Sequence, residues 1–312
     1  MKAVFLDRGS FPENLSIHFN KSITNYVEYH NTHETEVVER IQDADIVLTN
    51  KVVISREQIN NASALKLIQV MATGTNNVAM EACEEKGIKV QNVEGYSTTS
   101  VPEHTFAMLL ALRRNLVPYL QEVQSGAWGK SEFFCLMDYP IKDLSGSKIA
   151  IIGSGQLGTQ VSILAKAFGM QVMFVERKNR ADIRDGYVSF DQAIQDADII
   201  SLHCPLTPET QNLISEREFK RMRNHALLIN MGRGGIVNEE ALVKAIESKQ
   251  IAGAAFDVAA QEPMPSNSPL CRLTQYPNFL LTPHVAWASQ GAMEKLVQIA
   301  INRIHAFVET QK

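Results

Sequence analysis

The sequence lacks the features that mark nucleic-acid-binding, membrane and exported proteins. No run of five or six like charges occurs in its 312 residues, and the formal net charge is only −4, so no basic arm or patch is available. No stretch approaches the roughly 18 apolar residues of a membrane span. Asp7 and Arg8 interrupt the N-terminal apolar run before a signal peptide could form. We therefore expect a soluble, cytoplasmic protein without a nucleic-acid or membrane partner.

Cysteine is scarce, and its placement excludes two further classes. The four cysteines lie far apart and form no C-x-x-C pair, which fits reduced thiols better than a disulfide framework or a zinc site. His30 and His33 are the closest histidines, and no third ligand is evident beside them. We therefore expect no metal. The chain does have 45% apolar residues, enough at this length for about two globular domains.

Short apolar runs separated by helix-like polar stretches recur along the whole chain. This alternation is typical of βαβ units, and runs that are apolar throughout predict strands buried on both faces of a parallel sheet. Strands are expected at residues 3–6, 45–48, 65–70, 88–90, 148–152, 172–175, 199–202, 226–229, 251–256 and 279–281. So many strands exceed one comfortable sheet, and the expected fold class is α/β with two doubly wound parallel-sheet domains.

A short repeat indicates that both halves are wound alike. Residues 41–47, IQDADIV, return at residues 194–200 as IQDADII, each time where a helix ends and a strand begins. The repeat could reflect internal duplication or a good local solution for that junction. Between the halves, residues 101–123 predict the longest helix, kinked or ended near Pro118. Residues 126–147 predict an irregular aromatic segment that packs its rings.

A glycine-rich loop stands between a predicted strand and a predicted helix. Gly153, Gly155 and Gly158 form the pattern G-x-G-x-x-G. The first glycine permits a tight turn, the second lets the backbone approach a pyrophosphate, and the third lets helix and strand pack closely. The amides near Gln156 and Leu157 would face the phosphates at the positive end of the helix. The setting between strand and helix predicts a Rossmann dinucleotide site.

The residues after the next strand bear on the choice of dinucleotide. Glu176 stands close to the position, about 20 residues beyond the loop, at which an acid binds the adenosine ribose diol. Its charge should repel a 2′-phosphate. Arg177, Lys178 and Arg180 follow at once, and they form either a solvated basic turn or a place for that phosphate. NAD(H) is the favoured cofactor, and NADP(H) stays open.

Three polar loops in the C-terminal half each hold one candidate for chemistry. Arg233, Glu262 and His284 stand just beyond predicted strands, where ligands bind in open parallel sheets. Reduction of a 2-oxo acid needs a cation to hold the carboxylate and polarise the ketone, which suits Arg233. It also needs a proton donor, which suits His284, and a carboxylate that favours the protonated donor, which suits Glu262. Each alone could be a surface charge, a turn residue or a strand-end cap.

These residues bring the chain close to a known family. It resembles the D-isomer-specific 2-hydroxyacid dehydrogenases over nearly its whole length. The carrying segments are residues 72–77, 153–158, 203–210, 230–237, 253–257, 262–263 and 282–289. The resemblance implies that Arg233, Glu262 and His284 are catalytic, and that Thr73 and Gly74 hold the substrate carboxylate.

The resemblance also assigns further cofactor contacts. Asp257 would orient the nicotinamide carboxamide, Pro205 and Thr210 would lie along the adenine side, and Met231 would belong to the same site. The chain departs from the family's usual residues in having Ala79 for Asp, Gly232 for Ala and Glu176 for Asp. The first departure predicts a helix without its cap, and the last blurs the cofactor choice.

Within the family, residues 72–77, 134–140 and 284–289 look like the glycerate dehydrogenase (hydroxypyruvate reductase) branch. Trp287 would then wall the substrate pocket and limit substrate size, although it could also be ordinary packing. The implied reaction is the interconversion of a small 2-oxo acid and its D-2-hydroxy acid, hydroxypyruvate or glyoxylate being favoured. The alternatives are a dehydrogenase for another 2-oxo acid and a non-catalytic NAD(H)-sensing protein of the corepressor type.

The domain layout follows from where these motifs lie. The carboxylate loop at Thr73 and the loops of the three catalytic candidates must meet, and no Gly, Ser or Pro-rich linker stands at mid-chain. We therefore expect a discontinuous substrate domain of residues 1–98 and 287–312. Residues 99–286 would form an inserted dinucleotide domain, with the active site in the cleft between the two. The apolar helix around residues 106–116 exceeds the needs of one core and, by resemblance, predicts a homodimer.

Overall fold

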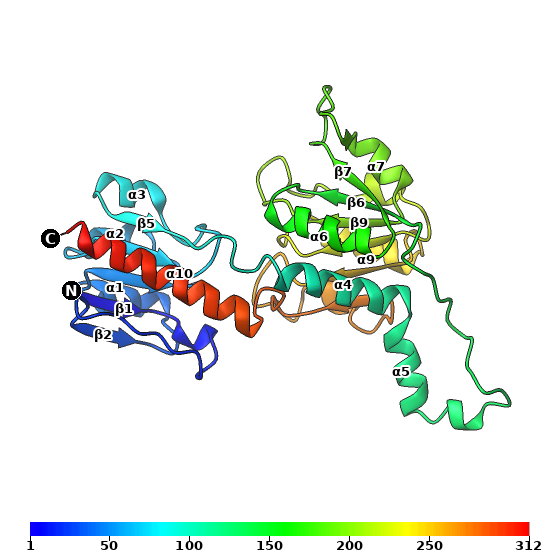
Figure 1. Ribbon diagram of the computed structural model, residues 1–312, viewed down its shortest axis with the longest axis horizontal. Helices are drawn as coiled ribbons and strands as arrows, with labels where there is room; N and C mark the ends of the chain where they lie inside the picture. The colour runs from blue at the N-terminus through cyan, green and yellow to red at the C-terminus, as the bar shows by residue number, and fades with distance from the viewer. Residues whose placement is uncertain (312) are drawn as a thin grey trace. The chain divides into compact units, whose positions relative to one another are not determined.

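A computed structural model describes residues 1–311, which form two compact units (Figure 1). Unit 1 comprises Met1–Ser97 and Ala288–Lys312, and unit 2 comprises Thr98–Trp287. Trp287, which the sequence placed in the substrate domain, groups with unit 2. Its ring packs on the core of that unit, and its indole Nε1 donates to the carbonyl of His284 at 2.9 Å. No helix within residues 1–311 is long and apolar enough to cross a bilayer.

Unit 1 is a five-stranded parallel sheet in the order β2-β1-β3-β4-β5. Its strands are β1 Lys2–Phe5, β2 Asn25–Glu28, β3 Ile46–Thr49, β4 Leu67–Val70 and β5 Lys89–Gln91. Its helices are η1 Arg8–Ser10, η2 Glu34–Glu36, α1 Val37–Ile41, α2 Arg56–Asn61, α3 Met80–Glu85 and α10 Gln290–Glu309. The order is that of flavodoxin. Helix α10, red in Figure 1, brings the C-terminus back to the unit that holds the N-terminus.

Unit 2 is a seven-stranded parallel sheet in the order β12-β11-β10-β9-β6-β7-β8. Its strands are β6 Lys148–Ile152, β7 Gln171–Val175, β8 Tyr187–Val188, β9 Ile199–Leu202, β10 Leu227–Asn230, β11 Gly253–Phe256 and β12 Phe279–Leu281. Its helices are α4 Ser100–Arg113, α5 Leu116–Gln124, η3 Trp128–Lys130, α6 Gln156–Ala167, α7 Phe190–Asp196, α8 Glu216–Phe219, α9 Glu239–Glu247 and η4 Pro269–Arg272. This is the Rossmann order with one added strand.

The apolar character of the strands has the expected origin. In β6, Ile149 and Ile151 belong to the apolar cluster on one face of the sheet, whereas Ala150 and Ile152 belong to the cluster on the other. Both faces are therefore covered, and a strand with two covered faces favours apolar residues at nearly every position. The fold class expected from the sequence, two parallel α/β sheets, is confirmed.

Two strands that the sequence did not predict lie at sheet edges. β2 pairs only with β1, and its residues Asn25–Glu28 are exposed or half-buried. β8 has two half-buried residues and pairs only with β7. Neither β2 nor β8 has a buried residue, and neither carries a continuous apolar run by which to recognise it.

The long helix expected over residues 101–123 is broken, but not at the expected residue. Helix α4 ends at Arg113 and α5 begins at Leu116, with Asn115 between them in the left-handed conformation at φ 48°. Pro118 lies in the first turn of α5, where its missing N–H has no helical acceptor to lose. The break predicted near Pro118 is therefore confirmed, but asparagine rather than proline supplies the turn.

The aromatic segment after α5 extends away from the sheet of unit 2 (Figure 1). Tyr139 packs edge-on against Tyr119 of α5, with ring centroids 5.2 Å apart. Phe133 and Phe134, however, are 73% and 90% exposed. The prediction that this segment packs its rings is thus wrong for these two phenylalanines, because they lie beyond the reach of the unit's core.

Candidate active site

The glycine loop joins β6 to α6 in the close packing that the pattern predicts. Gly153 has φ 105°, and a Cβ at this position would lie 2.6 Å from the carbonyl carbon of His203. A Cβ on Gly158 would lie 1.9 Å from the carbonyl oxygen of Gly153. Around Gly155, in contrast, a Cβ would meet no atom of the described chain within 4 Å. The loop therefore packs tightly against its neighbours at Gly153 and Gly158, and it leaves space at Gly155, where α6 starts.

This opening fits a dinucleotide. Gly155 is the N-cap residue of α6, so the amides of Gln156 and Leu157 lie at the positive end of a twelve-residue helix. The loop follows β6, whose neighbours β7 and β9 lie on opposite sides of it, where the strand order reverses. Open α/β sheets bind their ligands at such a switch point. The residues present therefore fit a pyrophosphate.

The neighbouring strand ends carry the other residues expected at the cofactor. After β9, the Thr210 hydroxyl donates to the carbonyl of Pro205 at 2.7 Å and closes a turn. After β10, Met231 is buried. The next residue, Gly232, is so close to the β9 loop that a Cβ on it would lie 3.1 Å from the Cys204 oxygen. These loops therefore lie at the carboxyl ends of the strands, where the glycine loop also lies.

The ribose acid expected at the end of β7 has a partner that the sequence did not predict. Arg184 donates to the carboxylate of Glu176 from Nε at 2.5 Å and from Nη2 at 3.1 Å. These hydrogen bonds, followed by one from the Arg177 amide, lower the pKa of Glu176 to about 2. Lys178 turns elsewhere, because its Nζ binds Glu218 at 3.0 Å. No sequence pattern marks Arg184, which lies in an irregular loop before β8.

Two of the three catalytic candidates are in direct contact. His284 Nδ1 lies 2.6 Å from Glu262 Oε2, although 22 positions separate the residues in the chain. The other carboxylate oxygen of Glu262 accepts the Ala259 amide at 3.0 Å. The backbone therefore holds one carboxylate oxygen of Glu262, and the other oxygen contacts the imidazole. Because Nδ1 is engaged in this way, Nε2 is the nitrogen that can serve a ligand.

The loop that carries Arg233, the third candidate, packs against the segment of Ala259, whose amide binds Glu262. A Cβ on Gly234 would lie 1.8 Å from the carbonyl oxygen of Ala259, so only glycine allows the two loops to touch. Asn230 closes the loop, because its amide nitrogen donates to the Arg233 carbonyl at 3.0 Å and its amide oxygen accepts Gly232 N–H at 3.1 Å. The Arg233 side chain folds back to the Gly232 carbonyl at 2.8 Å.

Asp257 holds the loop that carries His284. Its buried carboxylate accepts the Val285 amide at 2.9 Å, the Ala286 amide at 2.8 Å and the Thr282 hydroxyl at 2.6 Å. His284 itself has φ 55°, a left-handed conformation that needs support from its surroundings. The expected contact of Asp257 with the nicotinamide carboxamide stays a prediction, since one acceptor position on its carboxylate is unused by these bonds.

The remaining predicted residues lie in separate settings. Thr73 and Gly74 follow β4 in unit 1, where the Thr73 hydroxyl donates to the Val93 carbonyl at 3.0 Å and Asn92 Nδ2 donates to the Thr73 carbonyl at 2.7 Å. These bonds shape the loop and leave its role with a carboxylate a prediction. No group of three or more His, Cys, Asp or Glu suited to a metal occurs within residues 1–311.

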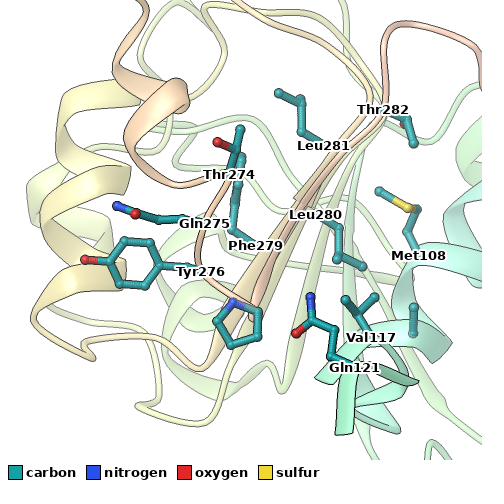
Figure 2. A pocket seen from close by; sticks show the side chains of 12 residues that line it. Met108, Val117, Gln121, Thr274, Gln275, Tyr276, Phe279, Leu280, Leu281 and Thr282 are labelled. Carbon is teal, nitrogen blue, oxygen red and sulfur yellow. The ribbon is translucent and has the colours of Figure 1, made fainter. Parts of the chain in front are cut away.

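A pocket of about 410 Å³ lies elsewhere in unit 2, and no predicted site residue lines it. Figure 2 shows Met108 of α4 and Val117 and Gln121 of α5 on one side, with Leu280 of β12 and Tyr276 on the other. Among the residues that line the pocket, Thr282 connects it to the His284 loop by donating to Asp257. The pocket lies between α4, α5 and residues 274–282.

Comparisons with known proteins agree with this geometry. Residues 106–286 match the family profile described as D-isomer specific 2-hydroxyacid dehydrogenase, NAD binding domain. The chain is 42% identical to a glycerate dehydrogenase of Methylorubrum extorquens over 98% of this chain and 96% of that one. It is 35% identical to a hydroxypyruvate reductase of Blautia hydrogenotrophica over 88% and 85%. A solved D-lactate dehydrogenase from Aquifex aeolicus, complexed with NAD and lactic acid, superposes with TM-score 0.83 at 26% identity over 99% and 96%.

Proposed function

We propose that this chain, which belongs to the D-isomer-specific 2-hydroxyacid dehydrogenase family, carries out its reaction with three loops of unit 2. These loops hold Arg233, Glu262 and His284. The reaction is the reversible reduction of a small 2-oxo acid to its D-2-hydroxy acid. The observation that carries the proposal is the contact between His284 Nδ1 and Glu262 Oε2 at 2.6 Å. It supplies a positioned proton donor at the carboxyl end of the sheet, where the dinucleotide loop also lies.

The proton donor is His284. Its Nδ1 faces a carboxylate, so the imidazolium has a counter-charge and Nε2–H is available for the substrate oxygen. Glu262 cannot rotate away freely, because the Ala259 amide binds its other oxygen at 3.0 Å. Asp257 fixes the backbone that follows His284 through the amides of Val285 and Ala286. The ring is therefore held at Nδ1 by Glu262, and the loop that carries it is held by Asp257.

Arg233 is the cation of the site. Its guanidinium offers five N–H donors in a planar fork, of which only the Nη1 bond to the Gly232 carbonyl is made within its own loop. The remaining donors can bind the substrate carboxylate and polarise the ketone. The assignments of Thr73, Gly74 and Trp287 to the substrate, made from the resemblance, stay predictions.

The cofactor is a nicotinamide dinucleotide, and we favour NAD(H) because Glu176 stands at the end of β7. The glycine loop would hold the pyrophosphate, Pro205 and Thr210 would flank the adenine, and Met231 and Asp257 would lie towards the nicotinamide. The bound dinucleotide supplies or accepts the hydride. Arg177 and Arg180 keep NADP(H) open, whereas Lys178 is committed to Glu218.

Hydroxypyruvate and glyoxylate are the proposed substrates. The relatives of this chain include a glycerate dehydrogenase and a hydroxypyruvate reductase, and the bulky Trp287 follows His284 closely in the same loop. The alternative of a non-catalytic NAD(H) sensor is disfavoured by the contact between Glu262 and His284, which a sensor does not need.

A spectrophotometric screen tests the reaction and the substrate together. Purified protein with NADH is given hydroxypyruvate, glyoxylate, pyruvate and a branched 2-oxo acid, and the absorbance of NADH is followed. We expect turnover on the first two above the others. Turnover confined to the branched acid would contradict hydroxypyruvate and glyoxylate as the substrates. Absence of turnover on every acid would favour the non-catalytic NAD(H) sensor.

We also infer that the chain is a homodimer and acts in the cytoplasm. Large apolar side chains on α5 and the segment after it are exposed, including Leu120, Phe133, Phe134 and Met137, and soluble monomers rarely expose such a patch. Sedimentation over a range of concentrations tests the dimer, with Phe134→Asp as the variant expected to weaken it. A monomer at every concentration would refute the dimer.

A further inference from the structure

The loop before β8 holds an arginine that the proposed function does not use. Arg184 binds both carboxylate oxygens of Glu176, Oε2 at 2.5 Å and Oε1 at 3.1 Å, and the Arg177 amide also donates to Oε1 at 2.8 Å. A carboxylate oxygen has about two acceptor positions, so these bonds leave one position on Oε2. A ribose diol that binds the acid through both hydroxyls needs two positions.

This arginine is linked to the glycine loop through one tyrosine. The Arg184 guanidinium lies over the ring of Tyr187, 4.0 Å from its centroid. The Tyr187 hydroxyl donates to Ser154 Oγ at 2.7 Å, and Ser154 is the residue between the first two glycines of the loop. A continuous set of contacts therefore joins the pyrophosphate loop to Glu176, which places Arg184 at the adenosine end of the cofactor site.

The charges around Glu176 favour an anion. The side chain of Glu176 is fully buried, whereas those of Arg184 and Arg180 are 46% and 45% exposed. Arg180 Nη1 lies 3.7 Å from the carboxylate. Two cations thus face solvent over one covered carboxylate. A planar guanidinium can donate two parallel hydrogen bonds to a phosphate.

We propose that Arg184 sets the dinucleotide preference of this chain and makes NADPH a cofactor alongside NADH. It does so by occupying the acid that would bind the ribose diol and by presenting an exposed guanidinium to the 2′-phosphate. The inference rests on the dinucleotide site of the proposed function. It differs from the sequence-based expectation, which left a place for the 2′-phosphate open at Arg177, Lys178 and Arg180.

Equilibrium binding separates this role from a structural one. The dissociation constants of NADH and NADPH are measured by nucleotide fluorescence for the wild type, Arg184→Gln and Arg221→Gln. Arg221 is a matched control, because it is an arginine of unit 2 that pairs with a carboxylate, Asp191, at 2.7 Å. We expect Arg184→Gln to raise the ratio of the NADPH constant to the NADH constant about tenfold, the scale of one charged hydrogen bond. The control ratio should equal that of the wild type.

The outcomes distinguish this inference from the proposed function. Wild-type protein that binds both dinucleotides, with a ratio unmoved by Arg184→Gln, overturns the role of Arg184 and leaves the proposed reaction standing. If the wild-type protein binds neither NADH nor NADPH, both the proposed cofactor site and this inference are wrong. If Arg184→Gln does not fold, Arg184→Lys keeps the charge without the fork. The lysine variant should raise the ratio severalfold, and an unchanged ratio there contradicts the inference.

Discussion

Glu262 Oε2 lies 2.6 Å from His284 Nδ1, and the Ala259 amide holds the second oxygen of the same carboxylate. The imidazole therefore faces a fixed acceptor on one side and leaves its other nitrogen available. The loops that carry the two residues follow β11 and β12, which are neighbours in the sheet. Strand adjacency thus accounts for a contact between residues far apart in the chain.

Replacing Glu262 by Gln should reduce turnover of the 2-oxo acid by about tenfold to a hundredfold, because the imidazolium loses its counter-charge. Steady-state kcat/KM for the reduction measures this effect. Glu216→Gln, which removes an exposed carboxylate of unit 2 that pairs with Lys244, is the control. A kcat/KM equal to that of the wild type would contradict the role of Glu262.

Asp257→Asn should lower both stability and activity. An asparagine side chain keeps one oxygen but turns an NH₂ group towards at least one of the donors on Thr282, Val285 or Ala286. A buried donor that faces another donor costs about 1–3 kcal/mol. Urea unfolding measures the loss, with the exposed Asp43→Asn as the control. Wild-type stability together with wild-type kcat would show that Asp257 does not position the His284 loop.

The sequence predicted the contact between Glu262 and His284 and missed the bonds from Arg184 to Glu176, for one physical reason. A buried parallel strand is apolar at nearly every position, and its carboxyl end has a defined neighbour. The loops of Arg233, Glu262 and His284 follow such strands and could therefore be grouped in advance. Arg184 lies in an irregular loop before the edge strand β8, where nothing in the sequence fixes the path of the chain.

The same distinction explains why the helix breaks at Asn115 rather than at Pro118. Pro118 is a visible break signal, but proline is tolerated in a first turn. Asn115 is an ordinary residue in the sequence, and only the structure shows its left-handed conformation. Local signals thus indicate that a helix ends nearby, while the position of the break depends on how α4 and α5 pack.

Ala79→Asp should stabilise the protein. Ala79 is the N-cap residue of α3 and has no side chain to accept the free amides of the first turn, as the departure from the family pattern predicted. An aspartate there should add about 0.5–2 kcal/mol to the free energy of unfolding. Chemical unfolding measures the gain, and Ala79→Val is the control that cannot cap. Equal stability of the aspartate and valine variants would refute the missing cap.

Acid should destabilise the protein in part through His203. Burial lowers the pKa of His203 from 6.5 to about 4, so the unfolded state binds more protons than the folded state between these values. Stability is then complete above about pH 6.5 and falls as the pH decreases towards 4, by up to about 3 kcal/mol for this group. Urea unfolding of the wild type and of His203→Gln across this range isolates the effect. An equal acid loss in both proteins would exclude His203.

The account depends most on His284 as the proton donor, and one comparison tests it directly. The rate of hydroxypyruvate reduction by His284→Ala is measured beside the wild type, together with the NADH dissociation constant of each. We predict that kcat falls by about a hundredfold or more while the NADH dissociation constant stays within about twofold, since the glycine loop is untouched. Reduction by the alanine variant at the wild-type rate would contradict the account.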